Sequence, residues 1–160
     1  MKPLAILLVI LVIAALAGVG YLYTSANFTV AFSSVVATDP LNQADYFAGL
    51  KSSLESKTFA GTEYSSAPLA SPENYLFYTW TLHAENHSFL PVDTVEIQVT
   101  PMTGDVLCIG DPADHSLSPG GAADLSVTFL TARSMHSVRE AVVTWYAWGL
   151  PFSTRLTLGK

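Results

Sequence analysis

The chain has 160 residues, of which 50% are hydrophobic and only 12% are charged. Seven Lys and Arg stand against thirteen Asp and Glu, giving a formal net charge of −6 at pH 7. An acidic chain without a basic run is a poor candidate for binding nucleic acid or anionic lipid. The single cysteine, Cys108, excludes an internal disulfide framework, and we expect it to be a small buried residue.

The N-terminal segment is the most hydrophobic part of the chain. Residues 4–23 carry no charge, and as a helix rising about 1.5 Å per residue they span about 30 Å, enough to cross a lipid bilayer. Lys2 precedes this segment, and the next Lys or Arg is Lys51. The positive-inside rule therefore predicts a cytoplasmic N-terminus, a signal-anchor helix over residues 1–24 and an extracytoplasmic domain over residues 25–160.

A cleaved signal peptide is the alternative for the same segment. Ala15-Leu-Ala17 fits the small-residue pattern of a cleavage site, and cleavage near Ala17 would leave a secreted protein. The hydrophobic run continues past this point, however, and ends in Tyr21 and Tyr23, whose rings favour the membrane interface. The pattern therefore favours a retained anchor that crosses the lipid bilayer.

The first elements after the anchor are a strand and a helix. Phe28–Phe32 alternates between apolar and polar side chains, which predicts a strand that runs on through Val36. Asp39 and Pro40 then match the N-cap and first position of a helix. Apolar residues at helical spacing predict that this helix covers about residues 40–57 and packs its stripe on the domain's own sheet. The stripe consists of Tyr46, Phe47, Leu50 and Leu54.

The remainder of the chain is predicted to be mainly β-structure. Residues 58–73 form a loop, with a short edge strand around Thr62–Ser65. In the strands that follow, side chains alternate between an apolar and a polar face. This alternation predicts two antiparallel sheets packed face to face, with wet outer faces. The expected strands are Tyr75–Asn86, Thr94–Thr100, Asp105–Ile109, Ala123–Thr131, Val138–Trp148 and Phe152–Leu158.

The stretch His83-Ala-Glu-Asn-His87 raises the question of a metal site. The two histidines fall on the polar face of a strand, about 13 Å apart at a rise of about 3.3 Å per residue. Zinc requires nitrogen ligands about 2 Å from one ion, so the sequence predicts a solvated face, no metal and no cofactor. A metal-dependent envelope hydrolase stays open as an alternative, because folding can bring these histidines together with His115 and the carboxylates of Asp111 and Asp114.

The most aromatic stretch, Trp145–Phe152, crosses a Gly-Pro turn. Trp145 is expected in the core of a central strand. The candidate interaction patch consists of Trp148, Leu150 and Phe152 beside the turn. A ligand-binding sensor that uses this rim is a further alternative function.

Several segments in order resemble the FxLYD and LEA14-like group of small immunoglobulin-like domains. They are Trp80–Asn86, Val95–Val99, Gly104–Leu107, Leu117-Ser-Pro-Gly120 and Leu125–Phe129. The aromatic Tyr-Asp pair of that group is replaced by Pro101-Met-Thr103. The resemblance implies a non-enzymatic, immunoglobulin-like β-sandwich, with a binding or structural role and without site residues.

We therefore expect a membrane-anchored, mainly β protein with a structural or protein-interaction role and a protein partner in the membrane or envelope. No G-x-S-x-G, Walker A or G-x-G-x-x-G motif points to an enzyme. Asn27-Phe-Thr and Asn86-His-Ser are N-glycosylation sequons for a host that glycosylates exported chains.

Overall fold

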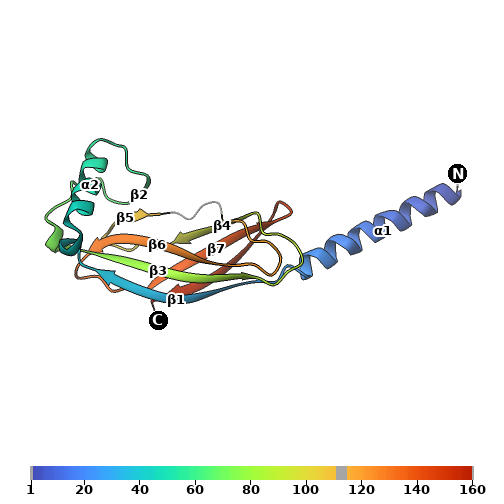
Figure 1. Ribbon diagram of the computed structural model, residues 1–160. Helices are drawn as coiled ribbons and strands as arrows, with labels where there is room; N and C mark the ends of the chain where they lie inside the picture. The colour runs from blue at the N-terminus through green and yellow to red at the C-terminus, as the bar shows by residue number, and fades with distance from the viewer. Residues whose placement is uncertain (1, 111–114, 160) are drawn as a thin grey trace.

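The computed structural model describes residues 2–110 and 115–159. A long apolar helix, α1 (Lys2–Thr24), extends from one end of a β-sandwich, and a shorter helix, α2 (Ala44–Glu55), lies at the opposite end (Figure 1). We refer to these as the α1 end and the α2 end. This arrangement confirms the predicted fold class, which is mainly β with two antiparallel sheets, one amphipathic helix and a preceding apolar helix.

The strands form a five-stranded sheet in the order β1-β3-β6-β5-β2 and a three-stranded sheet in the order β4-β7-β8. All of their pairings are antiparallel. Seven of the strands correspond closely to those predicted, and the predicted edge strand near Thr62 is β2, paired with β5. The bounds are β1 Phe28–Thr38, β2 Gly61–Glu63, β3 Tyr75–Asn86, β4 Thr94–Val99, β5 Asp105–Ile109, β6 Ala122–Ala132, β7 Arg139–Ala147 and β8 Leu150–Leu158.

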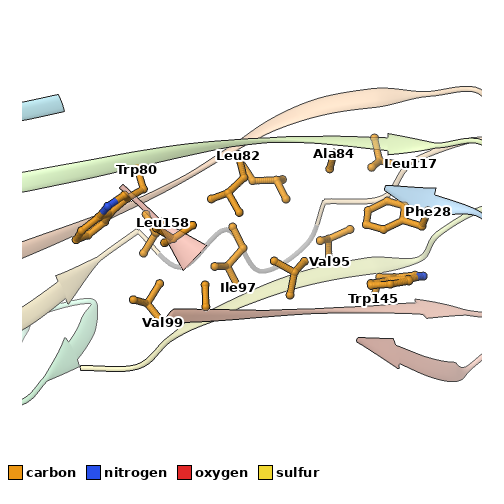
Figure 2. Packing of buried hydrophobic residues seen from close by; sticks show 14 of the residues in the cluster. Phe28, Trp80, Leu82, Ala84, Val95, Ile97, Val99, Leu117, Trp145 and Leu158 are labelled. Carbon is orange, nitrogen blue, oxygen red and sulfur yellow. The ribbon is translucent and has the colours of Figure 1, made fainter. Parts of the chain in front are cut away.

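The main core lies between the two sheets. Figure 2 shows Leu82 and Ala84 of β3 on one side of this layer and Val95 and Ile97 of β4 on the other. These four side chains are buried because every second residue of each strand points inward. The strand β7, which is apolar on both faces, lies in the centre of its sheet as the sequence predicts. Cys108 is half-buried against this core.

The helical region begins as the sequence predicts but contains two elements. The Asp39 carboxylate accepts a hydrogen bond from the Leu41 N–H at 3.0 Å and caps a 3₁₀ turn, Pro40–Gln43, which α2 follows. This bond, together with one from Arg133 at 2.8 Å, lowers the pKa of Asp39 from its ordinary value. The exposed capping turn is thereby fastened to the chain beyond β6.

The expectation that both outer sheet faces are wet is wrong at the α2 end. There, Phe47 and Leu50 of α2 pack against Phe77 of β3 and Leu130 of β6, forming a second core on the outer side of the five-stranded sheet. The predicted packing of the helical stripe on the domain's own sheet is confirmed for Phe47, Leu50 and Leu54, whereas Tyr46 remains 50% exposed. Phe77 breaks the alternation of β3 because a helix, rather than water, covers it.

A buried ion pair joins the two sheets near the α2 end. Arg139 of β7 donates from Nη2 to Asp105 Oδ1 at 2.6 Å and from Nε to Asp105 Oδ2 at 3.1 Å, and both side chains are fully buried. The remaining guanidinium donor, Nη1, bonds to the carbonyl oxygens of His136 and Val138. The Met102 N–H donates to the Asp105 carboxylate at 2.7 Å. Both charges are therefore paired and hydrogen-bonded, as a buried ion pair requires.

Breaking this pair is expected to destabilise the sandwich strongly. Arg139→Met leaves the Asp105 carboxylate buried without its counter-charge, which costs about 3–5 kcal/mol of unfolding free energy. The double variant Asp105→Asn/Arg139→Met removes both charges and should recover part of that loss. Denaturant unfolding measures both variants, and Arg155→Met on the exposed surface of β8 is the control, with an expected change within about 0.5 kcal/mol. Equal losses in the single and double variants would contradict this account.

Candidate functional site

The polar face of β3 carries a chain of ionisable side chains. His83 and His87 both contact Glu85, with His83 Nε2 at 3.1 Å from Oε1 and His87 Nε2 at 2.8 Å from Oε2. On the neighbouring strand, β6, Asp124 Oδ1 lies 2.6 Å from His83 Nδ1, because Asp124 pairs directly with His83 in the sheet register. The two imidazoles therefore lie on either side of the Glu85 carboxylate.

The environment of His83 favours its protonated form. Its hydrogen bond to Asp124 is the main cause that raises the pKa of His83 above its ordinary value, and Glu85 acts in the same direction. A protonated imidazole donates from both ring nitrogens, which matches a carboxylate oxygen on each side. This geometry provides a charged patch on a solvated face.

The metal hypothesis gains no ligand set from this arrangement. Across residues 2–110 and 115–159, the structure brings no three His, Cys, Asp or Glu side chains together to hold a metal ion. The carboxylates of Asp111 and Asp114, which the sequence groups with His115, lie outside the described residues.

The predicted interaction patch lies at the α1 end. Trp148 is 63% exposed and Leu150 is 43% exposed, whereas Phe152 is half-buried and stacks on Trp145 at a centroid distance of 6.0 Å. The ring of Phe152 also meets Tyr23 of α1 at 5.1 Å. The patch therefore lies directly beside the end of the apolar helix.

A pocket of about 260 Å³ lies between α1 and the hairpin that joins β7 to β8. Val19 and Tyr23 line it from the helix, and Ala26 lines it from the connector. The three patch residues line it from the sandwich, together with Leu90 and Ala147. The lining is almost entirely apolar, so the pocket fits hydrocarbon or aromatic groups rather than a charged ligand.

Phe89 is a member of this surface that the sequence pattern does not predict. It lies in the loop between β3 and β4, is 52% exposed, and stacks on Tyr21 of α1 at a centroid distance of 6.1 Å. The available signal was a phenylalanine at a loop tip, between Ser88 and Leu90, where no strand pattern buries it.

The loop that carries Phe89 is held by the buried Asn86. Its Nδ2 donates to the carbonyl oxygens of Leu90 at 2.8 Å and Leu117 at 3.0 Å, and its Oδ1 accepts from the Ser88 hydroxyl at 2.6 Å. Because Asn86 is 0% exposed, a glycan on its Nδ2 would break these bonds and is incompatible with the fold. The other sequon residue, Asn27, is exposed.

Comparison with solved structures gives distant likenesses. No family model matches the chain, and no curated protein does. A FixG-related protein from Vibrio parahaemolyticus is 11% identical with a TM-score of 0.40, covering 85% of this chain and 96% of that one. The GAE domain of yeast GGA1 is 11% identical with a TM-score of 0.37, covering 56% of this chain and 93% of that one. An uncharacterised β-sandwich protein from Clostridium difficile 630 is 8% identical with a TM-score of 0.33, covering 81% of this chain and 85% of that one.

The charged patch predicts a pH-dependent contribution to stability. Since the pKa of His83 is higher in the folded than in the unfolded state, the contribution is fully present below the unfolded value of about 6.5 and is lost as pH rises through the folded value. Asp124→Asn should lower the pKa of His83, as measured by NMR titration of the ring protons. Asp93→Asn, at an exposed position just before β4, changes the net charge equally and should leave that titration unchanged. A His83 titration unaffected by Asp124→Asn would contradict the assignment.

Proposed function

We propose that the chain is a single-pass membrane protein that holds its β-sandwich outside the cytoplasm, at the bilayer surface, for a structural or protein-interaction role. The observation that carries this proposal is an exposed apolar helix joined by three residues to Phe28, which is buried in the core of the sandwich.

The helix α1 has the length and surface of a transmembrane segment. Its most apolar part, Pro3–Tyr21, contains 19 residues, and none of that part is buried by the rest of the protein. At about 1.5 Å per residue it spans about 28 Å, close to the thickness of a bilayer's hydrocarbon core. An exposed helix of this composition requires a lipid environment, or removal as a signal peptide near Ala17.

The connection between the helix and the sandwich is short. Only Ser25, Ala26 and Asn27 separate the end of α1 from Phe28, the first residue of β1. Phe28 is buried in the main core and meets Trp145 at a centroid distance of 4.7 Å. A retained helix therefore holds the sandwich against the membrane rather than on a long tether.

The orientation follows from charge. Lys2 precedes the apolar segment, and no basic residue follows it before Lys51, which belongs to α2. The positive-inside rule then assigns the N-terminus to the cytoplasm and residues 25–160 to the outside. The α2 end, which lies farthest from α1 (Figure 1), would point away from the membrane. Its exposed apolar side chains, Leu41 and Tyr46, make that end the surface we assign to a protein partner.

We also propose kinship with the FxLYD and LEA14-like domains. Asn86 ends β3 as the Asn of that pattern does, and its side chain contacts the carbonyl oxygens of Leu117 and Ser118 in the Leu-Ser-Pro-Gly turn. Two sequence features of the pattern thus depend on each other physically. Pro101-Met-Thr103 remains a departure from it.

Labelling of an introduced cysteine tests the orientation. In a Cys108→Ala background, Ser52→Cys places an exposed thiol on α2. A membrane-impermeant maleimide should label this variant in intact cells to the same extent as in permeabilised cells. Labelling only after permeabilisation would reverse the proposed topology.

Two controls complete this experiment. Cys108→Ala alone gives the background of the labelling. The intact mass of the detergent-extracted chain should include the residues before Ala17, whereas a mature chain that begins after Ala17 would establish the secreted alternative.

A further inference from the structure

We propose that the α1 end of the sandwich is itself a lipid-binding surface, in which Phe89, Trp148 and Leu150 enter the boundary between headgroups and acyl chains. The inference rests on the proposed membrane anchor and goes beyond it, because an anchor alone does not require the sandwich to touch lipid. The predicted patch at Trp148 is thereby assigned to the bilayer rather than to a protein.

The depth of these residues is set by their contacts with α1. Tyr21 is the last residue of the apolar span, and its ring lies against Phe89. Tyr23 lies two residues further along and meets Phe152. When α1 crosses a bilayer, the tyrosines lie at its interface, so side chains within about 6 Å of them lie there as well. Contact with lipid at this end follows directly from these distances.

The pocket between α1 and the β7–β8 hairpin independently indicates that Trp148 and Leu150 lie at the depth of the membrane interface. Trp148 and Leu150 line it together with Val19, which belongs to the apolar span itself. A pocket with one wall inside the hydrocarbon span faces acyl chains rather than water. Its apolar lining matches that environment, which makes lipid a better occupant than a water-borne ligand.

The chemistry of the two loops fits a neutral interface. Neither residues 88–92 nor residues 147–152 contain an Asp, Glu, Lys, Arg or His, and His87, which precedes the first loop, is turned to Glu85 at 2.8 Å. Tryptophan and phenylalanine are suited to the headgroup level, where acidic groups would be expensive to desolvate. Since the chain as a whole is acidic, its attraction to the membrane here is apolar and not electrostatic.

The hairpin holds Trp148 in an unusual backbone conformation. Ala147 pairs with Leu150, so Trp148 and Gly149 form a two-residue turn, with φ angles of 54° and 71°. Glycine accepts this left-handed region freely, and asparagine commonly occupies the first position of such turns, but a bulky residue there is an outlier. A large exposed ring held at a strained turn indicates a role for that ring beyond folding.

The loop of Phe89 is equally well built. Asn86 and Ser88, both buried, fix its backbone through the hydrogen bonds described above. The two loops come from different parts of the sandwich, since one connects β3 to β4 and the other connects β7 to β8. Two loops with exposed apolar tips therefore both lie against the end of α1, and together with α1 they would fix the tilt of the sandwich.

Depth-resolved fluorescence quenching of the full chain tests this surface. Of the three tryptophans, Trp80 and Trp145 are buried and Trp148 is exposed. The chain is reconstituted into phosphatidylcholine vesicles whose acyl chains carry bromine near the headgroup, which quenches nearby indole rings. The wild-type chain should be quenched, and Trp148→Phe should lose most of that quenching. Acrylamide, a quencher dissolved in the water phase, should quench Trp148 only weakly, because the ring lies in the lipid.

Matched reporters separate the two ends of the molecule. In the Trp148→Phe background, Phe89→Trp places a reporter on the other loop and should restore quenching by the brominated lipid. Tyr46→Trp places a reporter of similar exposure, since Tyr46 is 50% exposed, on α2 at the opposite end and should not be quenched. Equal quenching of these two reporters would overturn the inference.

Flotation of the same vesicles distinguishes the inference from the proposal on which it rests. A chain that floats with the vesicles while Trp148 is quenched by acrylamide and not by bromine retains the anchor and overturns the lipid surface. In that case Trp148 is open to water and available to a protein partner. A chain that does not float overturns both.

Discussion

The burial of Phe28 couples the apolar helix to the β-sandwich, and the arrangement of the α1 end depends on it. Only three residues separate Phe28 from α1, yet its ring belongs to the core and packs beside Trp145. A connector of this length leaves little room for the sandwich to move away from the helix. The contacts of Tyr21 and Tyr23 with the sandwich follow from this short connection, as does the pocket beside them.

Buried polar side chains of different kinds join the structural elements at the two ends of the sandwich. Near the α2 end, the charged pair of Asp105 and Arg139 links the sheets and is shielded from water on all sides. At the α1 end, the neutral side chain of Asn86 joins the loops through hydrogen bonds to two carbonyl oxygens and one hydroxyl group. A neutral hydrogen-bonded side chain suits an end that we place at a lipid interface, because it adds no charge to a region of low dielectric constant.

Much of the fold could be predicted from short-range patterns. The alternation along Tyr75–Asn86 gave the bounds of β3 and the faces of its side chains, since strand geometry is local. The pair of Asp105 and Arg139 could not be predicted, because its members are 34 residues apart and meet only when the sheets pack. The contact of His83 with Asp124 was missed for a related reason, as it depends on the register of β3 against β6.

The candidate site was predicted only in part. The turn after Trp145 correctly pointed to an exposed Trp148, but the sequence offered no means of placing that turn beside α1. Phe89 was missed because loop residues carry no periodicity from which burial can be inferred. The helix that covers Phe77 was not predicted. A strand with apolar side chains on both faces does not reveal whether a helix or a sheet packs on its outer face.

An exposed apolar patch has a different meaning once its neighbour is a membrane helix. On a soluble domain, the ring of Trp148 would favour a protein partner, because apolar surface exposed to water is costly. If α1 crosses a bilayer as we propose, the same ring lies beside Val19 of the apolar span, and lipid would cover it. A protein partner is then best sought where apolar side chains remain in water. Leu41 and Tyr46 at the α2 end meet that condition, and the solvated patch of His83 and Glu85 on β3 lies along the side of the sandwich.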